Sequence, residues 1–63
     1  MKFVIAVEAV NSCQAKGKAR RKLAQWSYEN NTTIIIKSIR VSNAHGKKIV
    51  TIYSTEGDGT VHI

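Results

Sequence analysis

The chain has 63 residues, which is short for a single hydrophobic core and leaves room for one domain, residues 1–63. Ten lysines and arginines stand against four acids, and the resulting net charge of +6 favours polyanionic partners. One cysteine excludes an internal disulfide and fits a reducing cytoplasm. The first apolar run, Phe3–Val7, is shorter than a signal-peptide core, and no segment is long enough to span a membrane. We therefore expect a small basic cytoplasmic protein.

A strand and a helix are predicted in the first half of the chain. Residues 2–10 alternate in the manner of a strand, with a bulky side chain at every second position from Phe3. Residues 11–31 follow as a helix, with Asn11 as its N-cap and Gln14 as the capping-box partner. Trp26 is expected in the core and Tyr28 at the surface. The packing stripe of this helix comprises Ser12, Ala15, Ala19, Leu23 and Trp26.

Two further strands are predicted in the second half. Residues 32–42 are rich in β-branched side chains, but their alternation breaks at Lys37. Either both faces of this strand are buried, or a bulge near Lys37 switches the register. A turn over residues 43–46, with Gly46 at a positive φ, leads to a strand over residues 47–55. A second turn covers residues 56–59, and residues 60–63 are too short for more than a frayed edge strand.

This order of elements predicts an α+β fold: a single βαββ domain with one helix on a three-stranded, mainly antiparallel sheet, half of a ferredoxin-like unit. A right-handed crossover makes the first two strands parallel, with the third between them. The helix covers one face of the sheet. The other face is expected to carry Val4, Ala6, Ile34 or Ile36, Ile49 and Tyr53. An apolar face on so small a protein favours an interface, with a homodimer through the sheet face as one form of it.

Patterns for catalysis and metal binding are weak. Cys13, His45 and His62 lack the closely spaced ligand pairs of a zinc site. The four acids show no pairing suited to acid–base chemistry. We therefore expect a non-enzymatic protein with no catalytic residue, metal or cofactor. The sequence assigns no role to these three residues or to Gly17.

The predicted helix is strongly cationic. Lys18 and Lys22 repel one another at i,i+4, and Lys16 and Lys18 lie near the N-terminal end, where the helix dipole favours acids. The charges thus act slightly against the helix, which indicates a binding role, although lysine and arginine are also good helix formers on an exposed face. Base stacking on the sheet is not favoured, because the paired aromatics of an RNA-recognition motif are absent. The candidate phosphate contacts are Lys16, Lys18, Arg20, Arg21 and Lys22, joined by Lys47 and Lys48 from the hairpin.

Three segments resemble the podophage-encoded inhibitors of bacterial RNA polymerase. They are Lys2–Glu8, which is similar to that family's first strand, Leu23–Tyr28, which is similar to the end of its helix, and Ile36–Arg40, which is similar to its basic strand. More broadly, one helix between short strands resembles the small accessory proteins that phages make to manipulate a host. The resemblance implies a host-cell cytoplasmic protein that binds a host protein, with Lys37 and Arg40 as partner contacts.

Two classes of function therefore stay open. In the first, the cationic helix binds nucleic acid phosphates. In the second, the domain binds an acidic host protein surface and inhibits an enzyme such as RNA polymerase. The positive charge favours the first class, and the resemblance favours the second.

Overall fold

The alternating residues at the start of the chain form strand β1, Lys2–Val7, in the computed structural model, which describes residues 1–63. β1 pairs antiparallel with β3, Lys47–Ser54, and β3 pairs antiparallel with β2, Ile36–Ala44. β1 and β2 are therefore parallel, with β3 between them. This is the arrangement that the sequence predicts from a right-handed crossover.

The expectation of three strands is wrong, because a fourth strand joins the sheet. Strand β4, Thr60–His62, pairs parallel with β1 and gives the order β2-β3-β1-β4. The Met1 amino group holds the preceding loop by donating to the carbonyl oxygens of Glu56 at 2.9 Å and Gly57 at 2.7 Å. The Lys2 amide then donates to the Gly59 carbonyl at 3.0 Å. These long-range contacts give the last residues a fixed place that their own short pattern does not reveal.

Helix α1, Ser12–Glu29, begins and ends where the sequence predicts. The Asn11 side chain accepts a hydrogen bond from the Gln14 amide at 2.8 Å, as an N-cap does. The Gln14 side chain returns a bond at 2.8 Å, but it accepts from the Val10 amide and not from Asn11. Beyond the helix, Asn31 takes a left-handed φ of 51°, which ends the helical path.

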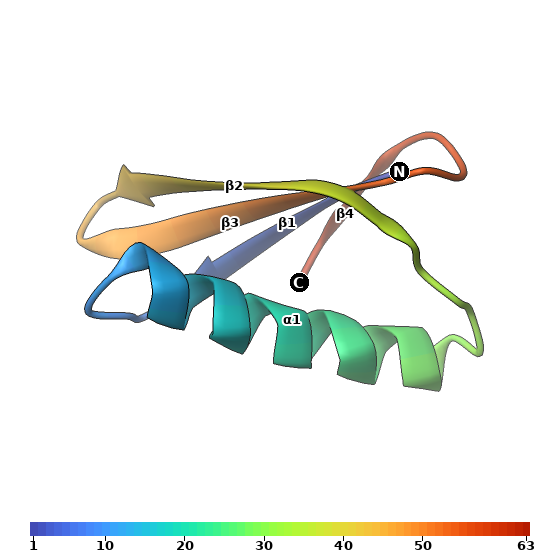
Figure 1. The fold of residues 1–63 in the computed structure, drawn as a ribbon, viewed down its shortest axis with the longest axis horizontal. Coiled ribbons are helices and arrows are strands. Elements are labelled where there is room, and N and C mark those ends of the chain that lie inside the picture. The colour runs from blue at the N-terminus through green and yellow to red at the C-terminus, as the bar shows by residue number, and fades with distance from the viewer.

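The core lies between α1 and a single face of the sheet (Figure 1). Small alanines on the helix stripe let it approach the bulky strand residues closely. Trp26 is half-buried and meets Phe3 edge to face, with ring centroids 5.1 Å apart. Ser12, the first residue of the predicted stripe, is exposed. The buried residues are Phe3, Ile5, Val7, Ala15, Ala19, Leu23, Val50 and Ile52.

A bulge at Lys37 decides which side chains face the helix. The β2–β3 register shifts between Ile36 and Ser38, so the bulge is the correct one of the two predicted alternatives. Ile36 and Ile34 both lie on the helix side, Ile36 in a groove beside Leu23 and Ile34 against the core. The expectation that one of them would join the opposite face is therefore wrong.

A two-residue turn joins β2 to β3 at His45 and Gly46. Both residues have positive φ, 49° and 78°, as a type I′ hairpin turn requires. This turn matches the right-handed twist of the two strands and fixes Lys47 at the start of β3. His45 thus has a conformational place in the hairpin that the sequence alone does not assign to it.

The half-buried ring of Trp26 makes a prediction about stability. We expect Trp26→Ala to lower the free energy of unfolding by about 2–3 kcal/mol, below the value for a fully buried ring because Trp26 is only half-buried. Tyr28→Ala is a matched control, since that ring is 87% exposed, and it should cost less than about 0.5 kcal/mol. Urea unfolding followed by circular dichroism measures both. Equal losses in the two variants would contradict the assignment of Trp26 to the core.

Candidate nucleic-acid interface

The five cations of α1 are all exposed, but they do not form one surface. The helix packs by Ala15, Ala19 and Leu23, and 3.6 residues per turn place Lys18, Arg21 and Lys22 on one side of that stripe. Lys16 and Arg20 fall on the other side. Arg20 accordingly lines a groove with Leu23 and Ile36, away from β1. The sequence predicted the five residues correctly as exposed, and the structure separates them into two flanks.

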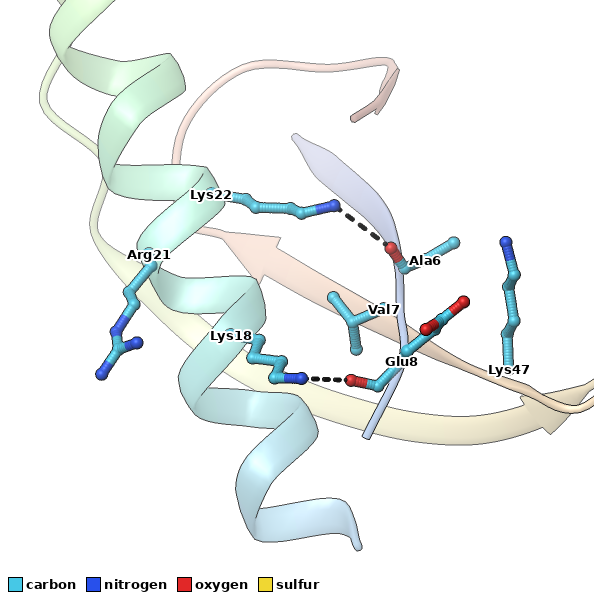
Figure 2. Close-up of a pocket in the computed structure, with 7 residues that line it drawn as sticks. All are labelled: Ala6, Val7, Glu8, Lys18, Arg21, Lys22 and Lys47. Carbon is cyan, nitrogen blue, oxygen red and sulfur yellow. Dashed lines mark hydrogen bonds between the residues drawn. The ribbon is translucent and has the colours of Figure 1, made fainter. Parts of the chain in front are cut away.

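Lys18 and Lys22 form the inner edge of the first flank. Lys18 Nζ donates to the Glu8 carbonyl oxygen at 2.6 Å, and Lys22 Nζ donates to the Ala6 carbonyl oxygen at 3.4 Å. Figure 2 shows both side chains crossing from α1 to β1, while Arg21 points away from the strand. The two lysines therefore hold the helix to the strand as well as carrying charge.

The carbonyls that they contact lie on a free edge of β1. Pairing with β4 extends only from Lys2 to Val4, and the Ile63 amide, which donates to the Val4 carbonyl oxygen at 3.0 Å, makes the last bond on this side. The backbone at Ala6 and Glu8 then has no neighbouring strand. Lysines at such an edge discourage the addition of a foreign strand. The sequence gives no sign of this contact, because it joins side chains to backbone groups across two elements.

A groove of about 450 Å³ follows this edge. Four cations and one acid line it, which gives 4 − 1 = +3 from side chains. Lys47 approaches from the β2–β3 hairpin on the far side of β1, as Figure 2 shows. Because Arg21 and Lys47 make no hydrogen bond within the chain, their charges are available to an anion. The lining residues are Ala6, Val7, Glu8, Lys18, Arg21, Lys22 and Lys47.

The remaining predicted site residues lie elsewhere. Lys48 Nζ donates to the Asn43 side-chain oxygen at 2.8 Å, so it braces the hairpin and does not line the groove. Lys37 and Arg40 of β2 line a separate depression on the uncovered face of the sheet, together with Lys2. Lys2 was not predicted as a site residue, since only its pairing beside β3 brings it near the β2 cations.

No group of three or more histidine, cysteine, aspartate or glutamate side chains is placed to hold a metal ion. Cys13 is an exposed free thiol. No helix has both the length and the apolar character needed to cross a membrane. Gly17 faces open space, so close packing does not explain it.

The chain matches no protein-family model, no curated protein and no solved structure.

The contact of Lys18 and Lys22 with β1 leads us to a prediction about self-association. Lys18→Met with Lys22→Met removes both donors and keeps much of their apolar stems, which leaves the edge carbonyls open to a second chain. We expect dimers or larger species to appear at concentrations where the parent is unaffected, with little loss of helicity. Size-exclusion chromatography with light scattering measures this.

Lys16→Met with Arg21→Met is the matched control. It removes the same charge from the same helix, but neither side chain contacts the β1 edge. If the control self-associates as strongly as the edge variant, loss of charge alone is responsible and the two lysines do not protect the strand.

Proposed function

We propose that this protein is a small non-enzymatic nucleic-acid-binding protein whose cationic helix flank contacts phosphates. The observation that carries the proposal is the groove beside β1, which four cations from two elements line together with only one acid. Such a cluster concentrates positive potential in a cleft and attracts a phosphate backbone. No contact to bases is part of the proposal.

The two flanks of α1 set an upper limit on the number of phosphates. A duplex approaching the groove meets Lys18, Arg21, Lys22 and Lys47. Lys16 and Arg20 lie on the other side of the helix stripe, and Lys48 does not line the groove. The proposal therefore involves about four phosphate contacts, fewer than the seven cations of the helix and hairpin would allow.

An inhibitor of a host enzyme such as RNA polymerase is the alternative function. It is supported by the resemblance of Ile36–Arg40 to a basic strand of that inhibitor family and by the joint position of Lys37 and Arg40 at one depression. An acidic protein surface would be its partner. Because an inhibitor of this kind buries an apolar centre, its affinity should depend on salt much less than phosphate binding does.

Charge reversal in the groove tests the proposed function. Arg21→Glu with Lys47→Glu should weaken binding of a short DNA duplex by roughly tenfold or more, because two phosphate contacts become repulsive. The fold should be retained, since both side chains are exposed and make no internal hydrogen bond. Fluorescence anisotropy of a labelled duplex measures the affinity.

The matched control is Lys16→Glu with Arg20→Glu on the other flank. Both double variants lower the formal net charge from +6 to +2, so long-range attraction falls equally in each. The groove variant should lose at least about fivefold more affinity than the control. Equal losses would mean that the duplex responds to total charge and not to the groove.

Salt dependence gives an independent prediction. Four phosphate contacts correspond to a slope of log K against log salt of about −3.6, or a loss of roughly 150-fold between about 50 and 200 mM salt. The groove variant should show a smaller slope than the parent. A parent slope near zero, or no duplex binding at the lowest salt, would reject phosphate binding by the groove.

A further inference from the structure

The uncovered face of the sheet carries one aromatic side chain, Tyr53 of β3. It is half-buried, and its cross-strand neighbours are Lys2 on β1 and Ser38 on β2. Arg40 is a diagonal neighbour, because it pairs with Thr51 two positions before Tyr53. Diagonal positions on a sheet are about 7–8 Å apart, which a long side chain such as arginine spans.

Tyr53 lies in a depression of about 420 Å³ with a cationic rim. Lys2, Lys37 and Arg40 line it together with a single acid, Asp58, so the side-chain balance is 3 − 1 = +2. The three cations come from two strands on either side of Tyr53. Ser38 and the loop glycines Gly57 and Gly59 also line the depression, and their small size leaves the ring and the cations uncovered by bulky neighbours.

The bulge at Lys37 contributes to this arrangement. It shifts the register so that Ser38 and Arg40 face away from the helix, while Ile39 and Val41 pack toward the core. On β2, the open face therefore carries serine and arginine in place of the expected apolar side chain. The face keeps two of the expected apolar residues beside Tyr53. Val4 follows Lys2 on the same face of β1 and lies opposite Thr51, as Arg40 does on the other side, while Ile49 lies nearer the hairpin.

We propose that this depression binds single-stranded nucleic acid, with one base stacked on Tyr53 and the flanking phosphates held by Lys2, Lys37 and Arg40. An aromatic ring beside cations on an open sheet is suited to an unpaired base, whose face is accessible, and not to a duplex, whose bases are stacked inside. Arg40 is also within reach of the base and can stack on it. The positive rim favours this occupant over an uncharged peptide or a second copy of the chain, whose cations would face the same cations.

The inference rests on the proposed function in one respect, since both require nucleic acid as the partner. The inference differs from the proposed function in the surface that binds and in the form of nucleic acid that is bound. The groove beside β1 contacts phosphates of any form through α1 and the hairpin, whereas the depression selects unpaired bases through Tyr53. The two surfaces share no lining residue, so variants of one leave the other intact.

The test compares an oligothymidylate of roughly ten nucleotides with a short duplex in the same anisotropy assay. Tyr53→Leu keeps an apolar side chain on β3 but removes the stacking ring, and it should weaken oligothymidylate binding by about fivefold to 150-fold. Tyr53→Phe keeps the ring and should remain within about twofold of the parent. Duplex affinity should be unchanged in both. Circular dichroism and thermal unfolding check that each variant is folded.

A second pair of variants keeps the test decisive if Tyr53→Leu does not fold. Lys2→Gln with Arg40→Gln should lower the salt slope for oligothymidylate by about 1.4, which is two single-strand phosphate contacts. Lys16→Gln with Arg20→Gln removes the same charge from the far flank of α1 and should leave that slope nearly unchanged.

The outcomes separate the two proposals. Oligothymidylate affinity that is the same in Tyr53→Leu and the parent overturns the stacking site, even if the groove variant loses duplex binding. Loss of oligothymidylate and duplex affinity to the same extent in folded Tyr53→Leu overturns it too, since the depression would then not select single strands. Tyr53-dependent binding of oligothymidylate without any duplex binding supports the stacking site and rejects the helix groove. Binding of neither probe rejects both and leaves this face to a protein partner.

Discussion

Strand β1 lies against helix α1 and pairs with both β3 and β4, while β2 joins it only through β3. Its odd-numbered side chains, beginning with Phe3, fill the core under α1. One backbone edge of the strand is fully paired with β3, and the first half of the other edge is paired with β4. The second half is contacted by Lys18 and Lys22. In a domain with only eight buried residues, this strand supplies three of them and positions the rest.

The dependence on β1 explains how the charges are distributed. Lys18 and Lys22 repel one another on the helix, but each donates to a carbonyl oxygen that has no strand partner. Their position is thus partly structural, and it weakens the inference that repulsion within the helix implies a ligand. Arg21 and Lys47 line the same groove without an internal hydrogen bond, so their charges have no structural role that would account for them and are the better evidence for a ligand. The functional reading therefore depends on where each cation points and not on the net charge of the chain.

Much of the fold follows from local sequence patterns. Three signals are strong because each follows directly from the period of its element. They are the alternation from Phe3, the helix stripe through Ala15 and Leu23, and the break at Lys37. β4 could not be predicted in the same way, because three residues carry almost no periodic signal. Its place depends on the Met1 amino group and on the loop at Gly57, more than fifty positions away in the sequence.

The candidate sites could be predicted from the sequence less well than the fold, for a similar reason. Helical geometry could have separated Arg20 from Arg21, since adjacent residues differ by about 100° around the axis. The depression around Tyr53 could not be derived in that way, because it requires the exact register of three strands and the effect of one bulge. A shift of one residue in β2 would turn Arg40 toward the core and bring Ile39 to the open face.

Two of the four acids of the chain lie in the cationic surfaces. Glu8 lines the groove beside β1, and Asp58 lines the depression around Tyr53, so each cationic surface contains one carboxylate. A single acid lowers the attraction for any polyanion but leaves both surfaces positive. One cationic surface thus lies along the free edge of β1 and the other on the open face of the sheet, so each is built from a different set of elements and can be altered without the other.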